Sequence, residues 1–261
     1  MTVLSTHALT IRQPGPDNDR LLCDRLDVEL NGGENWAILG ANGSGKTTLL
    51  HTLAGLRAAD DGYVQLGQHN LHGLSHRRRA QQLGVLFQDS HGLFPATVLE
   101  TVLTSRYPHQ SAGFIPWDNP DDKEMALAAI DTVGLRGFEH RSLSTLSGGE
   151  RRRVDIAALL TQDPALCLMD EPTNHLDLHH QTRLLRLLAQ RAAQPKHVNL
   201  FVLHDINLAL RYCTHGLLMF DGGEVCHGPL PGLIEDESLE MLYHCRFHHI
   251  TDGRNTFFYP A

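Results

Sequence analysis

Several classes of protein are excluded by what the sequence lacks. It contains no run of about 18 consecutive apolar residues, which is the length that a membrane-spanning helix requires. Its first eleven residues show no basic segment followed by an apolar one, so we expect no secretory signal. The five cysteines are widely spaced and form no CxxC pair, a pattern typical of reduced thiols in a cytosolic protein.

Basic residues are also scarce for a protein that binds nucleic acid. Lysine and arginine number 22 against 30 acidic residues, which gives a formal net charge of −8. Aromatic residues make up only 6% of the chain, whereas 41% of its 261 residues are hydrophobic. This composition predicts a globular protein with one substantial core and no nucleic-acid partner.

Four short apolar segments each end at a glycine or a polar residue. Because the segments do not alternate between apolar and polar residues, they indicate strands buried on both faces, in a parallel sheet covered by helices. The carboxyl ends of such strands line the ligand site of an open α/β sheet. The segments and the residues after them are 36–39 before Gly40, 85–87 before Gln88, 165–169 before Asp170 and 200–203 before His204.

Helical patterns lie between these segments. Apolar stripes predict helices over 47–53, 150–160 and 181–190. The stretch 89–146, which several prolines interrupt, predicts a mostly helical lobe with helices near 97–105 and 121–133.

We therefore expect a single α/β domain over 1–261, with a mostly parallel central sheet flanked by helices. Its core comprises 1–88, which includes an antiparallel β part near the start, and 147–220. The helical lobe is inserted at 89–146, and 221–261 forms a C-terminal hairpin followed by a short helix and tail.

A complete phosphate-binding loop, GANGSGKT, follows the first apolar segment and opens the first predicted helix. Its glycines let backbone N–H groups close around phosphate oxygens, and the helix N-terminus adds partial positive charge. Lys46 is expected to reach the outer phosphates of a nucleotide, and Thr47 to bind Mg²⁺. The nucleotide-binding residues predicted here are Gly40, Asn42, Gly43, Ser44, Gly45, Lys46, Thr47 and Thr48.

A second helix start that could accept an anion lies at Ser147. Ser147 and Glu150 have the spacing of a capping box, in which each side chain accepts a hydrogen bond from the backbone of the other. Gly148 and Gly149 between them leave the first N–H groups of the helix uncovered. The pattern is also that of an ordinary capped helix, but it stands here beside a phosphate-binding loop.

In this order, the motifs resemble those of the nucleotide-binding subunits of ATP-binding-cassette (ABC) transporters. The run LSGGE over 146–150 matches the family signature, and Asp170 with Glu171 matches the end of the Walker B strand. The run NHLD over 174–177 is similar to the D-loop. Gln88 matches the Q-loop, and His204 matches the switch histidine.

The resemblance implies an α/β P-loop NTPase that hydrolyses ATP with Mg²⁺. Two copies would pair head to tail, with each ATP between the phosphate loop of one copy and Ser147, Gly148 and Gly149 of the other. The resemblance assigns Mg²⁺ to Thr47, Gln88 and Asp170. Glu171 would activate the attacking water, Gln88 would sense the metal and the γ-phosphate, and His204 would contact the γ-phosphate. Asp177 would couple the two sites across the dimer, or would only cap a helix.

The resemblance also implies a role in import. Because one cassette stands here without a membrane segment, the channel would be a separate permease, served indirectly by a periplasmic substrate-binding protein. The chain would lie at the cytoplasmic face of the inner membrane. The stretches 98–109 and 203–209 are similar to importers of metal chelates, and 34–40 and 175–180 look closest to the cobalamin type, slightly ahead of ferric siderophore or haem importers. Phe94, Pro95 and Tyr107 would contact the permease or pack within the lobe.

Four features leave alternatives open. A soluble ABC-type ATPase of DNA repair or translation is the second candidate function, although only 58 residues (89–146) separate Gln88 from Ser147 and one cassette is present. The basic run 151–153 suggests packing or dimer-interface charge more than nucleic acid. His244 and His248 would share a face if their stretch were helical and could then hold a metal. The first strand ends without the aromatic residue that usually stacks on adenine, and Arg12 could replace it.

Overall fold

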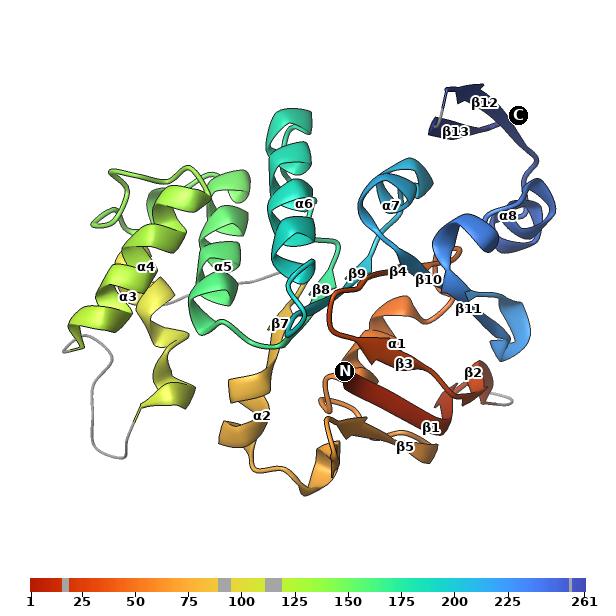
Figure 1. The fold of residues 1–261 in the computed structure, drawn as a ribbon, viewed down its shortest axis with the longest axis horizontal. Helices are drawn as coiled ribbons and strands as arrows, with labels where there is room; N and C mark the ends of the chain where they lie inside the picture. Colours follow the sequence, from red (N-terminus) through yellow and green to blue (C-terminus); the bar gives the residue numbers. More distant parts are fainter. Residues whose placement is uncertain (16–18, 89–94, 111–118, 254) are drawn as a thin grey trace. The chain divides into compact units, whose positions relative to one another are not determined.

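The computed structural model describes residues 1–15, 19–88, 95–110, 119–253 and 255–261 (Figure 1). They divide into two compact units, one comprising 1–73 and 189–261 and the other 74–188. The boundaries expected at residues 88, 147 and 220 stay a prediction.

The first unit begins with an antiparallel sheet. Its long strand β1 (Thr2–Gln13) pairs antiparallel with β2 (Arg20–Leu26), β3 (Glu29–Asn31) and β5 (Asp61–Leu66), and β5 pairs with the short β6 (His69–Asn70). Leu4, Leu9 and Ile11 of β1 are fully buried. The antiparallel start expected from the sequence is confirmed.

A second sheet in the same unit is mostly parallel. Strand β4 (Asn35–Leu39) lies between β9 (Val198–Val202) and β10 (His215–Met219), and both pairings are parallel. Strand β11 (Val225–Pro229) pairs antiparallel with β10. Every residue of β4 and β9 is buried, as expected for apolar segments without alternation.

The second unit contains its own parallel pair, β7 (Leu83–Leu86) and β8 (Leu166–Asp170). Helices α3 (Val98–Thr104), α4 (Pro120–Thr132) and α5 (Gly148–Gln162) pack against one another in this unit (Figure 1). An ion pair between the half-buried Arg106 and the buried Asp122, 2.6 Å from Nε to Oδ1, connects parts of this lobe. Between 95 and 146 the described residues form no strand, which agrees with the predicted helical lobe.

The remaining helices connect these elements. They are α1 (Lys46–Leu53), α2 (His76–Gln82), α6 (Leu178–Ala192), α7 (Ile206–Tyr212) and α8 (Asp236–Tyr243). Short 3₁₀ turns lie at η1 (Leu71–Gly73), η2 (Tyr107–His109), η4 (Leu143–Thr145), η5 (Asp221–Gly223) and η6 (Leu230–Gly232). No helix among the described residues is long and apolar enough to cross a membrane.

The C-terminal part adds a second hairpin that the sequence did not predict. The sequence predicts one hairpin and then a short helix within 221–261. In the structure β11 pairs with β10, which ends before residue 221, α8 is the short helix, and β12 (Phe247–Asp252) and β13 (Asn255–Pro260) form another antiparallel pair after it. Asn207 of α7 holds this hairpin, because its side chain donates to the carbonyl of Phe258 at 3.0 Å and accepts from the N–H of Phe258 at 2.8 Å.

The idea of a shared helix face for His244 and His248 is therefore wrong. His244 ends α8 in a left-handed conformation, with φ +58°, and His248 lies on strand β12. In the described part of the chain, no three His, Cys, Asp or Glu side chains form a group that could hold a metal ion.

Candidate functional site

The phosphate loop of the first unit connects β4 to α1. Gly45 precedes the helix with φ +101°, a conformation that residues with a Cβ rarely adopt, and a Cβ there would lie 3.0 Å from the side chain of Leu22. Within the described ranges, no side chain caps the start of α1. Its first N–H groups are therefore open to an anion.

Side chains of the loop complete a cradle for phosphate. Lys46 is buried, and its Nζ donates to the carbonyls of Gly40 at 2.8 Å and Ala41 at 2.9 Å. The hydroxyl of Ser44 is buried and has no hydrogen-bond partner among the described residues. A buried hydroxyl without a partner is costly, so this loop is suited to an acceptor such as a phosphate oxygen. Asn42, Gly43 and Thr47 are exposed at the rim, and Thr48 is half-buried.

His204 lies at the same sheet edge as this loop. Strands β4 and β9 are parallel neighbours in which Ile38 faces Val202, so Gly40 and His204 both follow the carboxyl ends of paired strands. The side chain of His204 is exposed. This agrees with the expectation that the ends of these strands share an edge.

In the second unit, Glu171 follows Asp170, the last residue of β8. Asp170 is only 1% exposed, whereas Glu171 is half-buried and its φ is +47°. A left-handed conformation costs a residue with a side chain about 1–2 kcal/mol, so neighbouring groups must hold the turn in place. We call residues 170–174 the catalytic turn, because they include Glu171, for which the sequence predicts a catalytic role.

Two side chains hold the carboxylate of Glu171. Its Oε2 accepts a hydrogen bond from Nε2 of Gln88 at 3.1 Å and another from Nδ2 of Asn174. Gln88 follows β7, the parallel neighbour of β8, which places it at the same edge as the catalytic turn. The structure thus brings Gln88 and Glu171 together as the sequence predicts, and adds Asn174 as a partner that had been placed only in the D-loop.

The capping box at Ser147 is present. The N–H of Ser147 donates to Oε2 of Glu150 at 2.7 Å, its hydroxyl donates to the same oxygen at 2.8 Å, and the N–H of Glu150 donates to the Ser147 hydroxyl at 3.3 Å. The hydrogen bonds from the backbone and side chain of Ser147 lower the pKa of Glu150.

The glycines inside the capping box have different surroundings. A Cβ on Gly149 would lie 2.8 Å from the carbonyl oxygen of His175, whereas a Cβ on Gly148 would make only ordinary contacts, 3.7 Å or more from the side chain of His175. Gly149 is thus required by the close approach of 174–177 to the start of α5. This contact lies within one copy and is separate from any role in anion binding.

Asp177 caps helix α6. Its Oδ1 accepts from the N–H of His180 at 2.8 Å, and its carboxylate pairs with Nδ1 of His180 at 2.9 Å. The hydrogen bond from the His180 backbone lowers the pKa of Asp177, and the contact with the His180 side chain lowers it further. Capping, one of the two roles left open by the sequence, is the role seen here, and coupling across a dimer stays a prediction.

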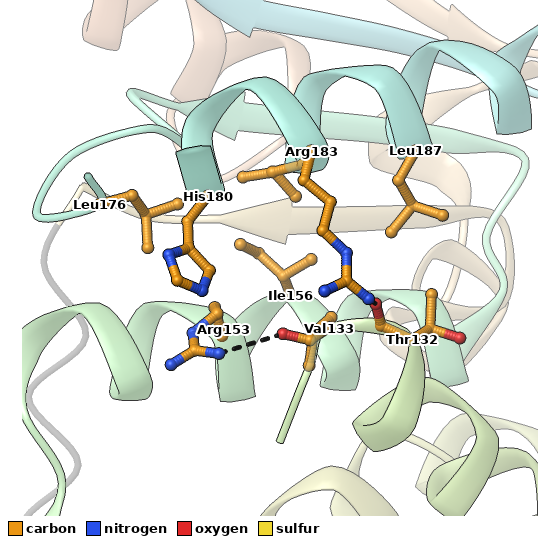
Figure 2. A pocket seen from close by; sticks show the side chains of 9 residues that line it. Thr132, Val133, Arg153, Ile156, Leu176, His180, Arg183 and Leu187 are labelled. Atoms are coloured by element: carbon orange, nitrogen blue, oxygen red, sulfur yellow. Dashed lines mark hydrogen bonds between the residues drawn. The ribbon is translucent and has the colours of Figure 1, made fainter. Parts of the chain in front are cut away.

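A small cavity lies beside this cap, between α5, α6 and the end of α4 (Figure 2). Arg153 and Arg183 extend across it (Figure 2). Arg183 donates to the carbonyl of Thr132, the last residue of α4, and Arg153 donates to those of Val133 and Gly134, which follow it. Burial lowers the pKa of Arg153. The volume of about 20 Å³ has room for about one water molecule and not for a nucleotide.

The basic run 151–153 makes packing contacts within the described part of the chain, and a role at a dimer interface stays a prediction. Arg151 donates to the carbonyls of Leu143 and Ser144, and Arg152 is 4% exposed beneath the catalytic turn. The sequence motifs did not connect Arg152 with the site. A signal was nevertheless present, since Arg152, Ile156 and Leu159 have the i, i+4, i+7 spacing of one buried helix face.

Three residues were expected to contact the permease or to pack within the lobe. Phe94 lies outside the described residues. Pro95 and Tyr107 are exposed, and 72% of the Tyr107 surface is accessible, so packing within the lobe is not the role of Tyr107.

Comparison with known proteins gives consistent results. A family model described as "ABC transporter" matches residues 23–174. The ferric enterobactin transport ATP-binding protein FepC of Escherichia coli K12 is 36% identical over 231 residues, 88% of this chain and 84% of the relative. The hemin import ATP-binding protein HmuV of Escherichia coli O157:H7 is 35% identical over 242 residues, 90% of this chain and 91% of the relative.

Two solved structures support the fold. A metal-chelate type ABC transporter in an inward-facing conformation has a TM-score of 0.84 at 27% identity, over 100% of this chain and 98% of that chain. An ATP-binding cassette in a dimeric post-hydrolysis state, bound to ADP and Pi, has a TM-score of 0.75 at 25% identity, over 87% of this chain and 98% of that chain. The α/β cassette fold predicted from the sequence is confirmed.

Proposed function

The chain belongs to the ABC transporter family of ATPases, and from this premise we propose that it powers an importer of a ferric siderophore or haem. The observation that carries the proposal is the pair of intact motifs, a phosphate loop with Lys46 and a catalytic turn in which Gln88 and Asn174 hold Glu171. Both motifs are needed for turnover, and neither is disrupted here.

The phosphate loop binds the triphosphate of ATP in this proposal. Its glycine backbone and the open start of α1 supply N–H donors, and Lys46 exchanges its loop carbonyls for phosphate oxygens. The Ser44 hydroxyl then gains the partner that it lacks within the described protein. The remaining loop residues, Gly40 to Thr48, shape the cradle.

The residues present also fit Mg²⁺. Asp170 provides a buried carboxylate, and Thr47 and Gln88 provide exposed oxygen atoms, which are the ligands that Mg²⁺ prefers. When bound, the metal neutralises charge on the phosphates. Glu171 accepts a proton from the attacking water, and His204 stabilises charge on the γ-phosphate.

Two copies of the chain form the working unit. Ser147, Gly148 and Gly149 of one copy bind the nucleotide held by the other, because two glycines inside the capping box of α5 let an anion approach the N–H groups of its first turn. Asp177 then lies near the boundary of the two copies. Permease subunits bind a surface that includes the exposed Tyr107, and the pair sits at the cytoplasmic face of the membrane.

The cargo is inferred from the relatives. FepC and HmuV are named for ferric enterobactin and hemin, and a third relative, 32% identical over 254 residues, is the iron(3+)-hydroxamate import ATP-binding protein FhuC of Bacillus subtilis 168. These names do not support the preference for cobalamin expected from 34–40 and 175–180. They also do not favour an ATPase of DNA repair or translation.

The test uses Glu171→Gln, with Lys46→Ala as its counterpart. Removing the charge of Glu171 should lower ATP turnover at least 100-fold while ATP binding persists, because phosphate binding uses other residues. Lys46→Ala should lose ATP binding itself. Turnover and equilibrium binding of a fluorescent ATP analogue distinguish the two losses, and parental turnover in Glu171→Gln would remove Glu171 from catalysis.

The same variants test the cargo. Cells that lack the chain should accumulate radioactive iron from haem or a ferric siderophore at least tenfold more slowly than cells that contain the parental chain. Expression of either variant in the deficient cells should not restore uptake. Unchanged uptake of both iron sources in the cells without the chain would contradict the proposed cargo.

A further inference from the structure

Arg152 donates hydrogen bonds to several backbone carbonyls beneath the catalytic turn. Its Nη2 donates to the carbonyls of Asp170 at 2.6 Å and Glu171 at 2.8 Å, and its Nε donates to the carbonyl of Pro172 at 3.3 Å. Its Nη1 donates to the carbonyl of Phe87. One guanidinium therefore joins two segments of backbone.

Both segments carry proposed catalytic side chains. Phe87 directly precedes Gln88, and the other three carbonyls belong to Glu171 and its two neighbours. Oε2 of Glu171 accepts from Nε2 of Gln88 at 3.1 Å, so the two side chains meet above the backbone that Arg152 holds. A displacement of either segment would break this hydrogen bond.

The conformation of Glu171 explains why a guanidinium is needed. With φ +47°, the turn directs three successive carbonyls, of Asp170, Glu171 and Pro172, to the same donor group. Convergent carbonyl dipoles in a buried place require several donors and positive charge. Arginine presents five N–H donors in a planar fork, whereas lysine presents three from a single atom.

Arg152 also belongs to the helix that starts at Ser147. The far end of this helix is held to the junction of α2 and β7, because Nε2 of Gln162 donates to the carbonyls of Ala80 in α2 at 2.7 Å and of Leu83, the first residue of β7, at 3.1 Å. Helix α5 is thus held near one end to the residue that follows β7 and near the other end to the start of β7.

We propose that Arg152 is a positioning residue for ATP hydrolysis, which fixes the backbone on which Glu171 and Gln88 stand and ties it to helix α5. The inference rests on the proposed ATPase function of Glu171. Arg152 touches neither nucleotide nor water in this account and acts only through the two side chains that it positions.

The test compares Arg152→Gln and Arg152→Lys with Arg183→Gln. Arg183 also donates to a backbone carbonyl, that of Thr132, but at the end of α4 and outside the proposed catalytic residues. The full-length variants are assayed for kcat, for KM of magnesium-ATP and for the number of nucleotides bound per chain. The binding stoichiometry separates a true loss of kcat from a loss of folded protein.

We expect Arg152→Gln to lower kcat at least tenfold while KM changes less than twofold and one nucleotide still binds per chain. Arg152→Lys keeps the charge but not the fork, so its kcat should fall at least fivefold, and Arg183→Gln should stay within twofold of the parental value. Hydrogen–deuterium exchange should increase in peptides covering 84–88 and 170–174 of both Arg152 variants and not in Arg183→Gln.

Several outcomes would overturn the inference. They are parental kcat in Arg152→Gln, parental kcat in Arg152→Lys, a loss that resides in KM or in binding stoichiometry, and unchanged exchange in both peptides. A parental chain that does not hydrolyse ATP would instead refute the proposed function, and the exchange experiment would still show whether Arg152 holds the turn.

Discussion

Helices α3 and α5 start with the same capping box but differ in the residues that it encloses. At α3, the N–H and hydroxyl of Thr97 each donate to Oε2 of Glu100 at 2.8 Å, and the N–H of Glu100 donates back at 3.3 Å. The corresponding distances at Ser147 and Glu150 are 2.7, 2.8 and 3.3 Å. The local geometry of the cap therefore does not distinguish a structural helix start from a functional one.

The two helix starts differ in the two residues that lie between the cap residue and the glutamate. In α3 these are Val98 and Leu99, both buried, so the first turn packs into the lobe. In α5 they are Gly148 and Gly149, so the two positions inside the capping box carry no side chains. A capped start stabilises either helix, but only the bare start of α5 can receive an anion closely.

The largest loss of stability should come from adding a side chain at Gly149, inside the capping box of α5. Gly149→Ala places a Cβ 2.8 Å from the carbonyl oxygen of His175, so we expect the free energy of unfolding to fall by about 1–3 kcal/mol. The matched variant Gly148→Ala makes only ordinary contacts and should be neutral or slightly stabilising. Urea denaturation measures both, and equal losses would show that the approach of His175 is not the reason for Gly149.

A smaller loss of stability should come from removing the hydroxyl that caps each helix. Ser147→Ala and Thr97→Ala should each lower the free energy of unfolding by about 1 kcal/mol, because each removes the same hydrogen bonds. Only Ser147→Ala should also lower ATP turnover, by about tenfold, since only that helix start binds nucleotide in our proposal. Thermal unfolding and ATPase assays on the two variants check this. Equal ATP turnover in Ser147→Ala and Thr97→Ala would show that Ser147 only caps the helix.

The smallest expected effect is the loss of a stabilising contribution from the two capping glutamates at low pH. The pKa of Glu100 and that of Glu150 are both lowered, first by the backbone hydrogen bond from the cap residue and then by its side chain. Because a lowered pKa stabilises the fold above the ordinary carboxylate pKa, this contribution should disappear as the pH falls through the lowered values. Carbon-13 NMR titration of the glutamate carboxyls should show both shifts, and a shift at Glu150 alone would mean that its surroundings, not the cap, set its pKa.

The elements that the sequence predicted well are those with strong local patterns. The apolar segments before Gly40, Gln88, Asp170 and His204 are strands or lead directly from strands, because side chains buried on both faces leave no polar alternation. The capping box of Ser147 is encoded by two residues three positions apart. In each case the physical cause lies within a few neighbouring residues.

The elements that the sequence did not predict depend on distant partners. The role of Arg152 requires carbonyls from two other segments, after β7 and after β8, and their approach exists only in the folded chain. Strands β12 and β13 are mostly exposed, and the hairpin is held by Asn207 more than forty residues earlier in the chain, so no apolar pattern marked it. The left-handed turn at Glu171 likewise has no local sign, because its residue is not glycine.

The most direct test of the central claim is a structure of the Glu171→Gln chain with magnesium-ATP. Our account predicts two copies with two nucleotides, each bound by the phosphate loop of one copy and by Ser147 of the other. A structure in which each nucleotide contacts a single copy, with Ser147 away from every phosphate, would contradict it.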